Sequence, residues 1–222
     1  MSGRADSQTP GGAQLVLATR NRHKVVELRE ILADVVRARG LSVDLDTAVV
    51  GAEAFADLPD VVEDGDTFAA NALLKARAVC AATGLPALAD DSGLAVDILG
   101  GAPGIFSARW SGAHGDDRAN LELLLAQLSD VRDEHRAAGF VCAAALVTPA
   151  GSETVEHGHV RGTLERAPRG GNGFGYDPIL RVDEQRTLAE YTNAEKNAIS
   201  HRGEALRAIA PHVVDLLTGP GA

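Results

Sequence analysis

Two adjacent carboxylates, Asp90 and Asp91, follow an apolar run and precede Ser92 and Gly93. In open α/β sheets, ligands bind beyond the carboxyl ends of the strands, which is where this pair is expected. Hard carboxylate oxygens beside a phosphate favour Mg²⁺, which neutralises charge and helps to generate a water nucleophile. The same residue types also form ordinary turns, so the pair alone leaves both interpretations open.

A basic segment follows the first apolar run, residues 15–18, at the point where a strand is expected to end and a helix to begin. Cations at a helix start oppose the helix dipole unless an anion is bound there by free backbone N–H groups. The segment therefore favours a phosphate site, with a solvated helix start as the alternative. Its residues are Thr19, Arg20, Asn21, Arg22, His23 and Lys24.

The same arrangement recurs near the C-terminus. Thr192 opens a capping box, which places Lys196 in the first turn of a short helix. Ser200 has the residue type of an N-cap, so His201 and Arg202 are expected to begin the last helix. Ion pairs with acidic groups are the alternative explanation. Two cationic helix starts in one acidic chain favour a polyphosphate ligand.

A glycine-rich segment, residues 170–177, carries two of the eight aromatic residues of the chain (five Phe, two Tyr and one Trp). Glycine lets the backbone approach a ligand closely, and an aromatic ring stacks on a flat base. Phe174, Gly175, Tyr176 and Asp177 are therefore candidates for base recognition, with Asp177 accepting from a ring N–H. The alternative is a bent connection whose aromatic side chains fill the core.

The composition is that of a globular protein: 222 residues, 45% hydrophobic and 23% charged. A net charge of −10 argues against a nucleic-acid polymer or an anionic membrane as partner. No apolar run reaches the length of a membrane span or resembles a signal peptide. Cys80 and Cys142 stand within apolar patterns and are expected to be buried, reduced thiols, which favours the cytoplasm.

The elements expected to position these residues alternate between strands and helices. Strands are expected at 15–18 and 85–89, the latter running into the carboxylate pair, and helices end at Gly40, Gly84 and about residue 128. Residues 139–148 and 153–164 are expected to form an antiparallel hairpin, followed by a strand and two helices. This order predicts an α/β fold with a mixed central sheet, formed by one domain over residues 14–218. Residues 1–13 and 218–222 are expected to be disordered.

With these groups in chain order, the sequence resembles the non-canonical purine NTP pyrophosphatases, also called inosine triphosphatases or RdgB-type enzymes. The shared motifs are LATRNRHK, TFAANALLKA, ADDSGLAVDILGGAPGIFSARWSG, GFGYDP and SHRGEAL, and the match runs from residue 15 to about residue 217. The resemblance implies two lobes around a substrate cleft, with helices flanking the mixed sheet, and a homodimer.

The resemblance also implies roles for single residues. Asp91 is implied to be the catalytic proton acceptor and a magnesium ligand, and Ser92 to contact substrate. Lys75 matches a helix lysine that reaches the nucleotide in some members. A second metal carboxylate is expected upstream of that helix, where Glu63 has the better spacing. The other carboxylates in that region are Asp60, Asp64 and Asp66.

Two segments and three single residues complete the implied nucleotide site. Thr19 to Lys24 resemble the phosphate-binding loop, and Phe174 to Asp177 resemble the base-recognition loop. Three cationic or titratable side chains are implied to complete the site: Lys196, His201 and Arg202.

The implied reaction is attack of water on a phosphate of ITP, dITP or XTP, which yields the nucleoside monophosphate and pyrophosphate. Such an enzyme removes deaminated purines from the nucleotide pool. The alternatives are a Maf-like pyrophosphatase of other modified nucleotides, a nucleotide-binding regulator without catalysis, and a kinase or transferase.

Overall fold

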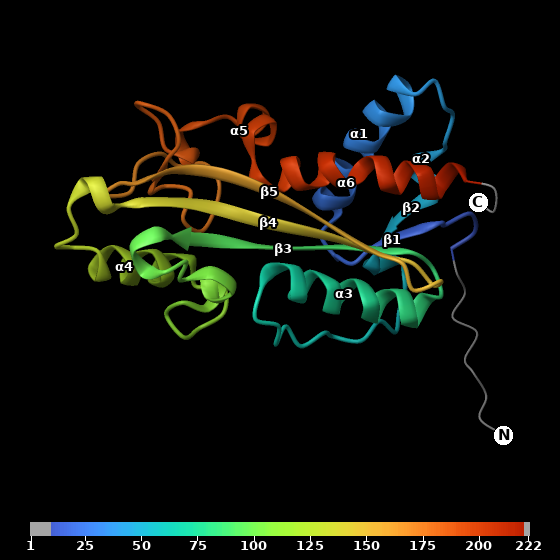
Figure 1. The fold of residues 1–222 in the computed structure, drawn as a ribbon, viewed down its shortest axis with the longest axis horizontal. Coiled ribbons are helices and arrows are strands. Elements are labelled where there is room, and N and C mark those ends of the chain that lie inside the picture. The colour runs from blue at the N-terminus through green and yellow to red at the C-terminus, as the bar shows by residue number, and fades with distance from the viewer. Residues whose placement is uncertain (1–9, 220–222) are drawn as a thin grey trace.

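The computed structural model describes residues 10–219 (Figure 1). The segments expected to be disordered therefore lie mostly outside the described residues. Within them, Pro10 to Ala13 form a turn, in which the Ala13 N–H donates to the Pro10 carbonyl at 3.0 Å. Thr218, which was placed in the disordered C-terminal segment, is instead the last residue of the final helix.

The sheet is mixed, as predicted, and has the strand order β2-β1-β3-β4-β5-β6. β1 pairs in parallel with β2 and with β3, and the remaining neighbours are antiparallel. The expected hairpin is confirmed as β4 and β5. The strands are β1 Leu15–Leu17, β2 Val49–Gly51, β3 Ala87–Val96, β4 Ala137–Val147, β5 Glu153–Leu164 and β6 Leu180–Arg181.

Six α-helices accompany these strands in the described part of the chain, and the expected long helices are all among them. A one-turn helix, α2, was not predicted. The helices are α1 Arg22–Ala38, α2 Leu45–Ala48, α3 Phe68–Thr83, α4 Asp117–Gln127, α5 Asn193–Ile199 and α6 His201–Thr218. Short 3₁₀ helices cover Ala52–Ala54, Asp97–Leu99, Gly104–Arg109, Asp133–His135 and Leu188–Glu190.

The two faces of the sheet are covered by different helices (Figure 1). Leucines and valines of α1 and α6 form one core with Leu88 and Leu146 of the strands. On the other face, α3 presents Ala72 and Ala76 to Ala89 of β3. These small side chains bring α3 close to the sheet, so polar residues on the same helix can reach β3.

Local sequence accounts for the ends of α3 and α6. The Thr67 side chain caps α3 by accepting from the Ala70 N–H at 3.1 Å, and Gly84 ends it in the left-handed region at φ 71°. The Ser200 side chain accepts from the Gly203 N–H at 3.0 Å, which confirms the predicted N-cap of α6. The helices that carry Lys75, His201 and Arg202 therefore begin at defined residues.

β3 is one continuous strand from Ala87 to Val96, so the turn interpretation of residues 90–93 is wrong. Asp90 and Asp91 pair with Ala144 and Ala143 of β4. They lie within the strand rather than beyond its carboxyl end, because the residues after them continue the ladder with β4.

The opposite edge of β3 is partly open. β1 pairs with β3 at Ala87 and Leu88, and the Ala18 N–H donates to the Leu88 carbonyl at 2.7 Å. Among residues 10–219, no strand lies beside this edge between Ala89 and Leu94. The carboxylate pair therefore stands just past the end of β1, and Ser107 covers the edge further on, where its Oγ accepts from the Leu94 N–H at 2.9 Å.

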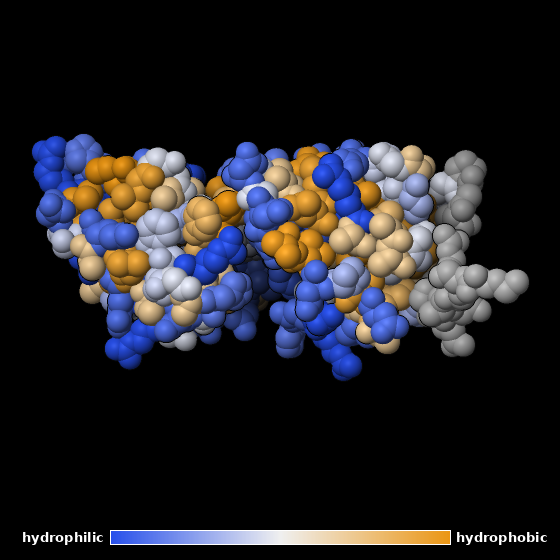
Figure 2. Space-filling model, turned by 90° about the horizontal axis from the view of Figure 1, so that it is seen from below, coloured by the Kyte–Doolittle hydropathy of each residue, from blue (hydrophilic) through white to orange (hydrophobic). Residues whose placement is uncertain are grey.

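The far ends of β3, β4 and β5 belong to a second lobe that contains α4 and the long connection after β5 (Figure 1). Leu94 and Phe140 pack there with Leu124 of α4 and with Ile179. Figure 2 shows a hollow between the two lobes on the face that carries α3 and α4. The predicted two-lobed α/β fold is therefore confirmed. No helix within residues 10–219 is both long and apolar enough to cross a bilayer.

Candidate functional site

Asp90 is a buried carboxylate on the side of β3 that faces α1 and α6. Its side chain is 4% exposed, and its Oδ2 accepts from Lys24 Nζ at 2.9 Å and from Arg202 Nε at 3.2 Å. Arg202 also donates to Glu27 of α1. One carboxylate of the strand therefore holds cations from the first turns of two helices, and the two predicted cationic helix starts are brought together.

Asp91 lies on the opposite side of β3, facing α3. Lys75 Nζ lies 3.3 Å from its Oδ1, and Asn71 Nδ2 donates to its Oδ2 at 3.2 Å. Lys75 also lies 3.3 Å from Oε2 of Glu63. Burial and the nearby Glu63 raise the pKa of Asp91, and Lys75 opposes that shift. The structure therefore brings together three residues to which the family resemblance had given separate roles: Glu63, Lys75 and Asp91.

Asn71 is a functional candidate that the sequence interpretation missed. It is 1% exposed, and its amide is oriented by the Gly65 N–H, which donates to its Oδ1 at 2.9 Å. Residues four apart on a helix share one face, so the spacing of Asn71 and Lys75 was the available signal.

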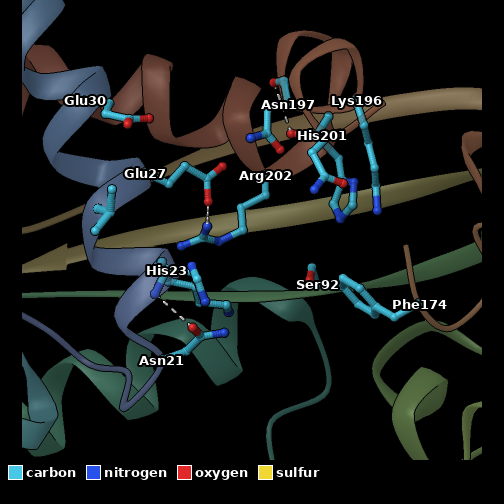
Figure 3. Close-up of a pocket in the computed structure, with 14 residues that line it drawn as sticks. Asn21, His23, Glu27, Glu30, Ser92, Phe174, Lys196, Asn197, His201 and Arg202 are labelled. Atoms are coloured by element: carbon cyan, nitrogen blue, oxygen red, sulfur yellow. Dashed lines mark hydrogen bonds and ion pairs between the residues drawn. The ribbon is translucent and has the colours of Figure 1, made fainter. Parts of the chain in front are cut away.

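A cavity of ≈ 890 Å³, here the α1 cavity, lies between α1 and the Phe174 loop. Figure 3 shows Ser92 on β3 between Arg202 on one side and Phe174 on the other. Eight of the sequence-predicted site residues line this cavity: Asn21, His23, Lys24, Ser92, Phe174, Lys196, His201 and Arg202.

A second cavity of ≈ 860 Å³, here the α3 cavity, lies on the other side of the sheet. Four predicted residues line it: Thr19, Arg20, Glu63 and Lys75. His114 joins them and had not been singled out. The loop from Thr19 to Lys24 therefore has one end at each cavity, beside the open edge of β3.

The Thr19–Lys24 loop is organised by its own side chains. Thr19 Oγ1 accepts from the Asn21 N–H at 3.2 Å, and Asn21 caps α1 by accepting from the His23 N–H at 3.0 Å. Arg20 is exposed and lies 3.7 Å from Asp60. Arg22 is exposed and stands outside the lining of both cavities.

The two aromatic residues of the predicted base-recognition loop differ in burial. The Phe174 ring is 75% exposed and lines the α1 cavity, with Lys196 Nζ 4.9 Å from its centroid. Tyr176 is 3% exposed, belongs to the core of the second lobe and donates to the Ser107 carbonyl at 2.9 Å. The base-stacking interpretation therefore suits Phe174, and the core-filling alternative is correct for Tyr176.

Asp177 and Gly175 position this loop. The Asp177 side chain is 4% exposed, and its Oδ2 accepts from the Phe174 N–H at 2.8 Å and from Lys196 Nζ at 2.6 Å. The Gly175 N–H donates to Asp117 of α4 at 3.0 Å, a partner that sequence reading missed. Both bonds engage Oδ2 of Asp177 and position the loop. Direct contact of Asp177 with a base stays a prediction.

His201 stacks on Phe140, with ring centroids 4.9 Å apart and an interplanar angle of 13°. Its Nδ1 is buried and has no hydrogen-bond partner among the described residues. Burial, with the nearby Lys196, lowers its pKa to about 4. The imidazole is therefore neutral at pH 7 and presents one donor and one acceptor nitrogen.

The donors for a divalent cation are few. Within residues 10–219, no group of three or more Asp, Glu, His or Cys side chains is arranged to hold a metal. Glu63 and Asp91 supply hard oxygens that converge on one point, the ammonium of Lys75. This donor set fits a Mg²⁺ ion that completes its coordination with water and substrate phosphates.

Sequence comparison decides the family. A model of the Ham1 family matches residues 15–212. This chain belongs to the Ham1 family. It is 63% identical over 205 residues to the dITP/XTP pyrophosphatase of Streptomyces avermitilis, covering 92% of this chain and 98% of that protein. It is 52% identical to the dITP/XTP pyrophosphatase of Nocardia farcinica, covering 92% of this chain and 96% of the relative.

Solved structures of Ham1 relatives have the same fold. A nucleoside-triphosphatase/dITP/XTP pyrophosphatase from Mycobacterium abscessus superposes with a TM-score of 0.75 at 49% identity, covering 90% of this chain and 99% of that one. The Ham1 protein of Staphylococcus aureus has a TM-score of 0.80 at 35% identity, covering 90% of this chain and 98% of that one.

Proposed function

We propose that this Ham1 protein hydrolyses ITP, dITP and XTP to the nucleoside monophosphate and pyrophosphate, and so removes deaminated purines from the nucleotide pool. The observation that carries the proposal is the position of Asp91. Its carboxylate lies on the α3 side of β3, 3.3 Å from Lys75 Nζ, just past the point where β1 has ended. Relatives up to 63% identical are dITP/XTP pyrophosphatases, which supports the same reaction.

In this proposal, the nucleotide lies along the Thr19–Lys24 loop. Its base occupies the α1 cavity, and its phosphates reach the α3 side of β3. Lys24 and Lys75 stand on the two sides of that strand and can pair with different phosphate oxygens. The positive end of the α1 dipole favours the same anion.

Asp91 is the proposed proton acceptor for the attacking water. Its raised pKa makes its ionised form a stronger base than an exposed aspartate. Asn71 holds one carboxylate oxygen at 3.2 Å and so fixes the plane of the group. In this proposal, Lys75 pairs with phosphate oxygens that gain charge as the anhydride breaks.

Mg²⁺ is the proposed cofactor, and Glu63 and Asp91 are the residues that would hold it. When bound there, Mg²⁺ neutralises phosphate charge and makes a nearby water easier to deprotonate.

Base recognition is assigned to the α1 cavity. The exposed Phe174 ring can stack on a purine, and the neutral His201 can donate to or accept from its edge. Arg202 is fixed by Asp90 and Glu27, and burial lowers its pKa to about 10, so it stays cationic at pH 7. A cation and fixed donors suit a 6-oxo purine better than adenine, whose 6-amino group is a donor.

We further propose that the protein is a homodimer that acts in the cytoplasm, and that residues 14–218 are its single catalytic domain. The family match begins at residue 15, so residues 1–13 are assigned no catalytic role. A variant without residues 1–9 should keep the wild-type kcat/KM for dITP. A large loss would show that this segment supports the site or the dimer.

The decisive experiment measures kcat/KM with Mg²⁺ for dITP, XTP, ATP, GTP, dUTP and dTTP, and separates pyrophosphate from orthophosphate in the products. The proposed function predicts pyrophosphate release with clear preference for dITP and XTP. A preference for dUTP or dTTP would favour the Maf-like alternative. Binding without turnover would favour a nucleotide-binding regulator. Formation of a nucleoside diphosphate would favour a kinase or transferase.

A further inference from the structure

Lys75 bridges two carboxylates on the α3 side of β3. Its Nζ lies 3.3 Å from Glu63 Oε2 and 3.3 Å from Asp91 Oδ1. The Lys75 side chain is 17% exposed and that of Asp91 is 15% exposed, so water screens this contact weakly. An ammonium therefore already pairs with the two carboxylates to which the proposed function assigns Mg²⁺.

Both oxygens of Asp91 have donors. Asn71 Nδ2 donates to Oδ2 at 3.2 Å, and Lys75 lies at Oδ1. Asn71 is itself held by the Gly65 N–H, so its amide is not free to turn away. A divalent cation that binds Asp91 and Glu63 together must therefore displace the ammonium of Lys75.

We propose that Lys75 is a competing cation that keeps divalent metal away from Glu63 and Asp91 until a triphosphate arrives. Without an anion, an incoming dication meets a nearby like charge on Lys75 and breaks both of its ion pairs. With a triphosphate present, the flexible lysine side chain can turn to phosphate oxygens. The competition serves catalysis if the proposed function, with its magnesium requirement, is correct.

Metal and nucleotide are then coupled through one side chain. The two protein carboxylates are too few to complete the coordination of Mg²⁺, which commonly takes substrate phosphates as further ligands. The phosphates thus supply both the missing ligands and a new partner for Lys75. By linkage, each ligand strengthens the binding of the other by the same factor.

A purely organising lysine makes the opposite prediction. If Lys75 serves to hold Glu63 and Asp91 together for the metal, its loss separates two like charges and weakens metal binding. If Lys75 competes with the metal, its loss strengthens metal binding. The sign of the change therefore separates the two roles without any measurement of turnover.

The experiment is a titration with Mn²⁺ alone, followed by electron paramagnetic resonance of the free ion, on the full-length protein. Lys75→Gln should bind Mn²⁺ about tenfold or more tightly than the wild type, because a like charge beside the site has been removed. Lys75→Arg keeps the charge and should bind Mn²⁺ as weakly as the wild type. Lys196→Gln removes the same charge beside Asp177, and its Mn²⁺ affinity should stay within about twofold of the wild-type value.

A second substitution identifies the binding site. Adding Glu63→Gln to Lys75→Gln should abolish the gain, because one of the two metal carboxylates is lost. The inference is overturned if Lys75→Gln binds Mn²⁺ no better than the wild type, or if no variant binds it. A gain in Mn²⁺ affinity in a protein that releases no pyrophosphate from dITP would leave the competition intact and refute the proposed function.

Discussion

Asp90 and Asp91 are consecutive residues of β3, yet their carboxylates lie on opposite sides of the strand and bind different cations. Asp90 accepts from Lys24 and Arg202, whereas Asp91 accepts from Lys75. The alternation of side chains along a strand imposes this division. One carboxylate therefore positions the cations of α1 and α6, and the other lies beside Lys75 and Asn71 of α3, where the proposed function places water and metal.

Lys24→Ala should weaken the binding of all nucleoside triphosphates alike and should also destabilise the protein. The helix dipole alone predicts a more stable variant, but Lys24 pairs at 2.9 Å with Asp90, which is 4% exposed. Because Arg202 still pairs with Asp90 and Lys24 is itself 35% exposed, we expect a loss of about 1–2 kcal/mol.

The measurements are urea unfolding and kcat/KM for dITP and ATP. His23→Ala is the matched control, because His23 lines the same cavity and follows the same helix start without pairing to Asp90. A Lys24→Ala variant that unfolds like the wild type, or that loses dITP but not ATP turnover, would contradict the assignment.

His201 should make the protein less stable in acid. Its pKa of about 4 lies below the ordinary value of 6.5, so the unfolded chain binds the proton more readily than the folded one. The resulting loss of stability begins as pH falls below about 6.5, is complete below about pH 4, and amounts to roughly 2–4 kcal/mol. Burial dominates the shift, Lys196, Lys24 and His159 add to it, and Asp90 opposes it.

Thermal unfolding of the wild type and of His201→Asn between pH 7 and pH 4 isolates this contribution, because all other groups titrate in both proteins. The difference in melting temperature between the two should shrink or reverse towards pH 4. Parallel curves across the whole range would show that His201 is protonated as easily in the folded protein as in the unfolded chain.

Phe174→Ala and Tyr176→Phe should separate binding from stability within one loop. Phe174 is 75% exposed, so its truncation should leave the melting temperature unchanged while lowering kcat/KM for dITP about tenfold through lost base stacking. Tyr176→Phe removes the hydroxyl that donates to Ser107 and should cost about 1 kcal/mol of stability with a smaller kinetic effect. Equal kinetic losses in both variants would remove Phe174 from the base site.

Much of the fold could be predicted from sequence, because local patterns determine it. The apolar stripe of α1, the N-caps Thr67 and Ser200 and the hairpin of β4 and β5 are each encoded within a few residues. The sequence left the continuous course of β3 through Asp90 open, because Asp-Asp-Ser-Gly has turn propensity. Pairing with β4 over ten residues overrides that propensity in the folded chain.

The candidate site was predicted as a set of residues, but not as an arrangement. Residue types indicated phosphate chemistry at Lys24 and metal chemistry at the Asp90–Asp91 pair, and the family resemblance added Lys75. The partners that orient them come from distant segments: Glu27 reaches Arg202 across 175 positions, and Asp117 reaches Gly175 across 58. Such pairings follow from tertiary packing, so no local pattern in the sequence announces them.

The same limit applies to the two aromatic residues of the glycine-rich loop. Phe174 and Tyr176 stand two positions apart and have similar propensities, yet one is exposed and the other is buried. The core of the second lobe and the Ser107 carbonyl decide which ring is taken inside.

The most direct test of the account compares Asp91→Asn with Asp90→Asn in hydrolysis of dITP, with dIMP and pyrophosphate quantified and nucleotide binding measured separately. Asp91→Asn should lose more than about 10²-fold in kcat while still binding dITP, because it removes the proton acceptor and a metal ligand but keeps the shape. Asp90→Asn should mainly raise KM, since its partners Lys24 and Arg202 bind rather than react. Near-normal turnover by Asp91→Asn, or an equal kcat loss in Asp90→Asn at unchanged KM, would contradict the assignment of the chemistry to the α3 side of β3.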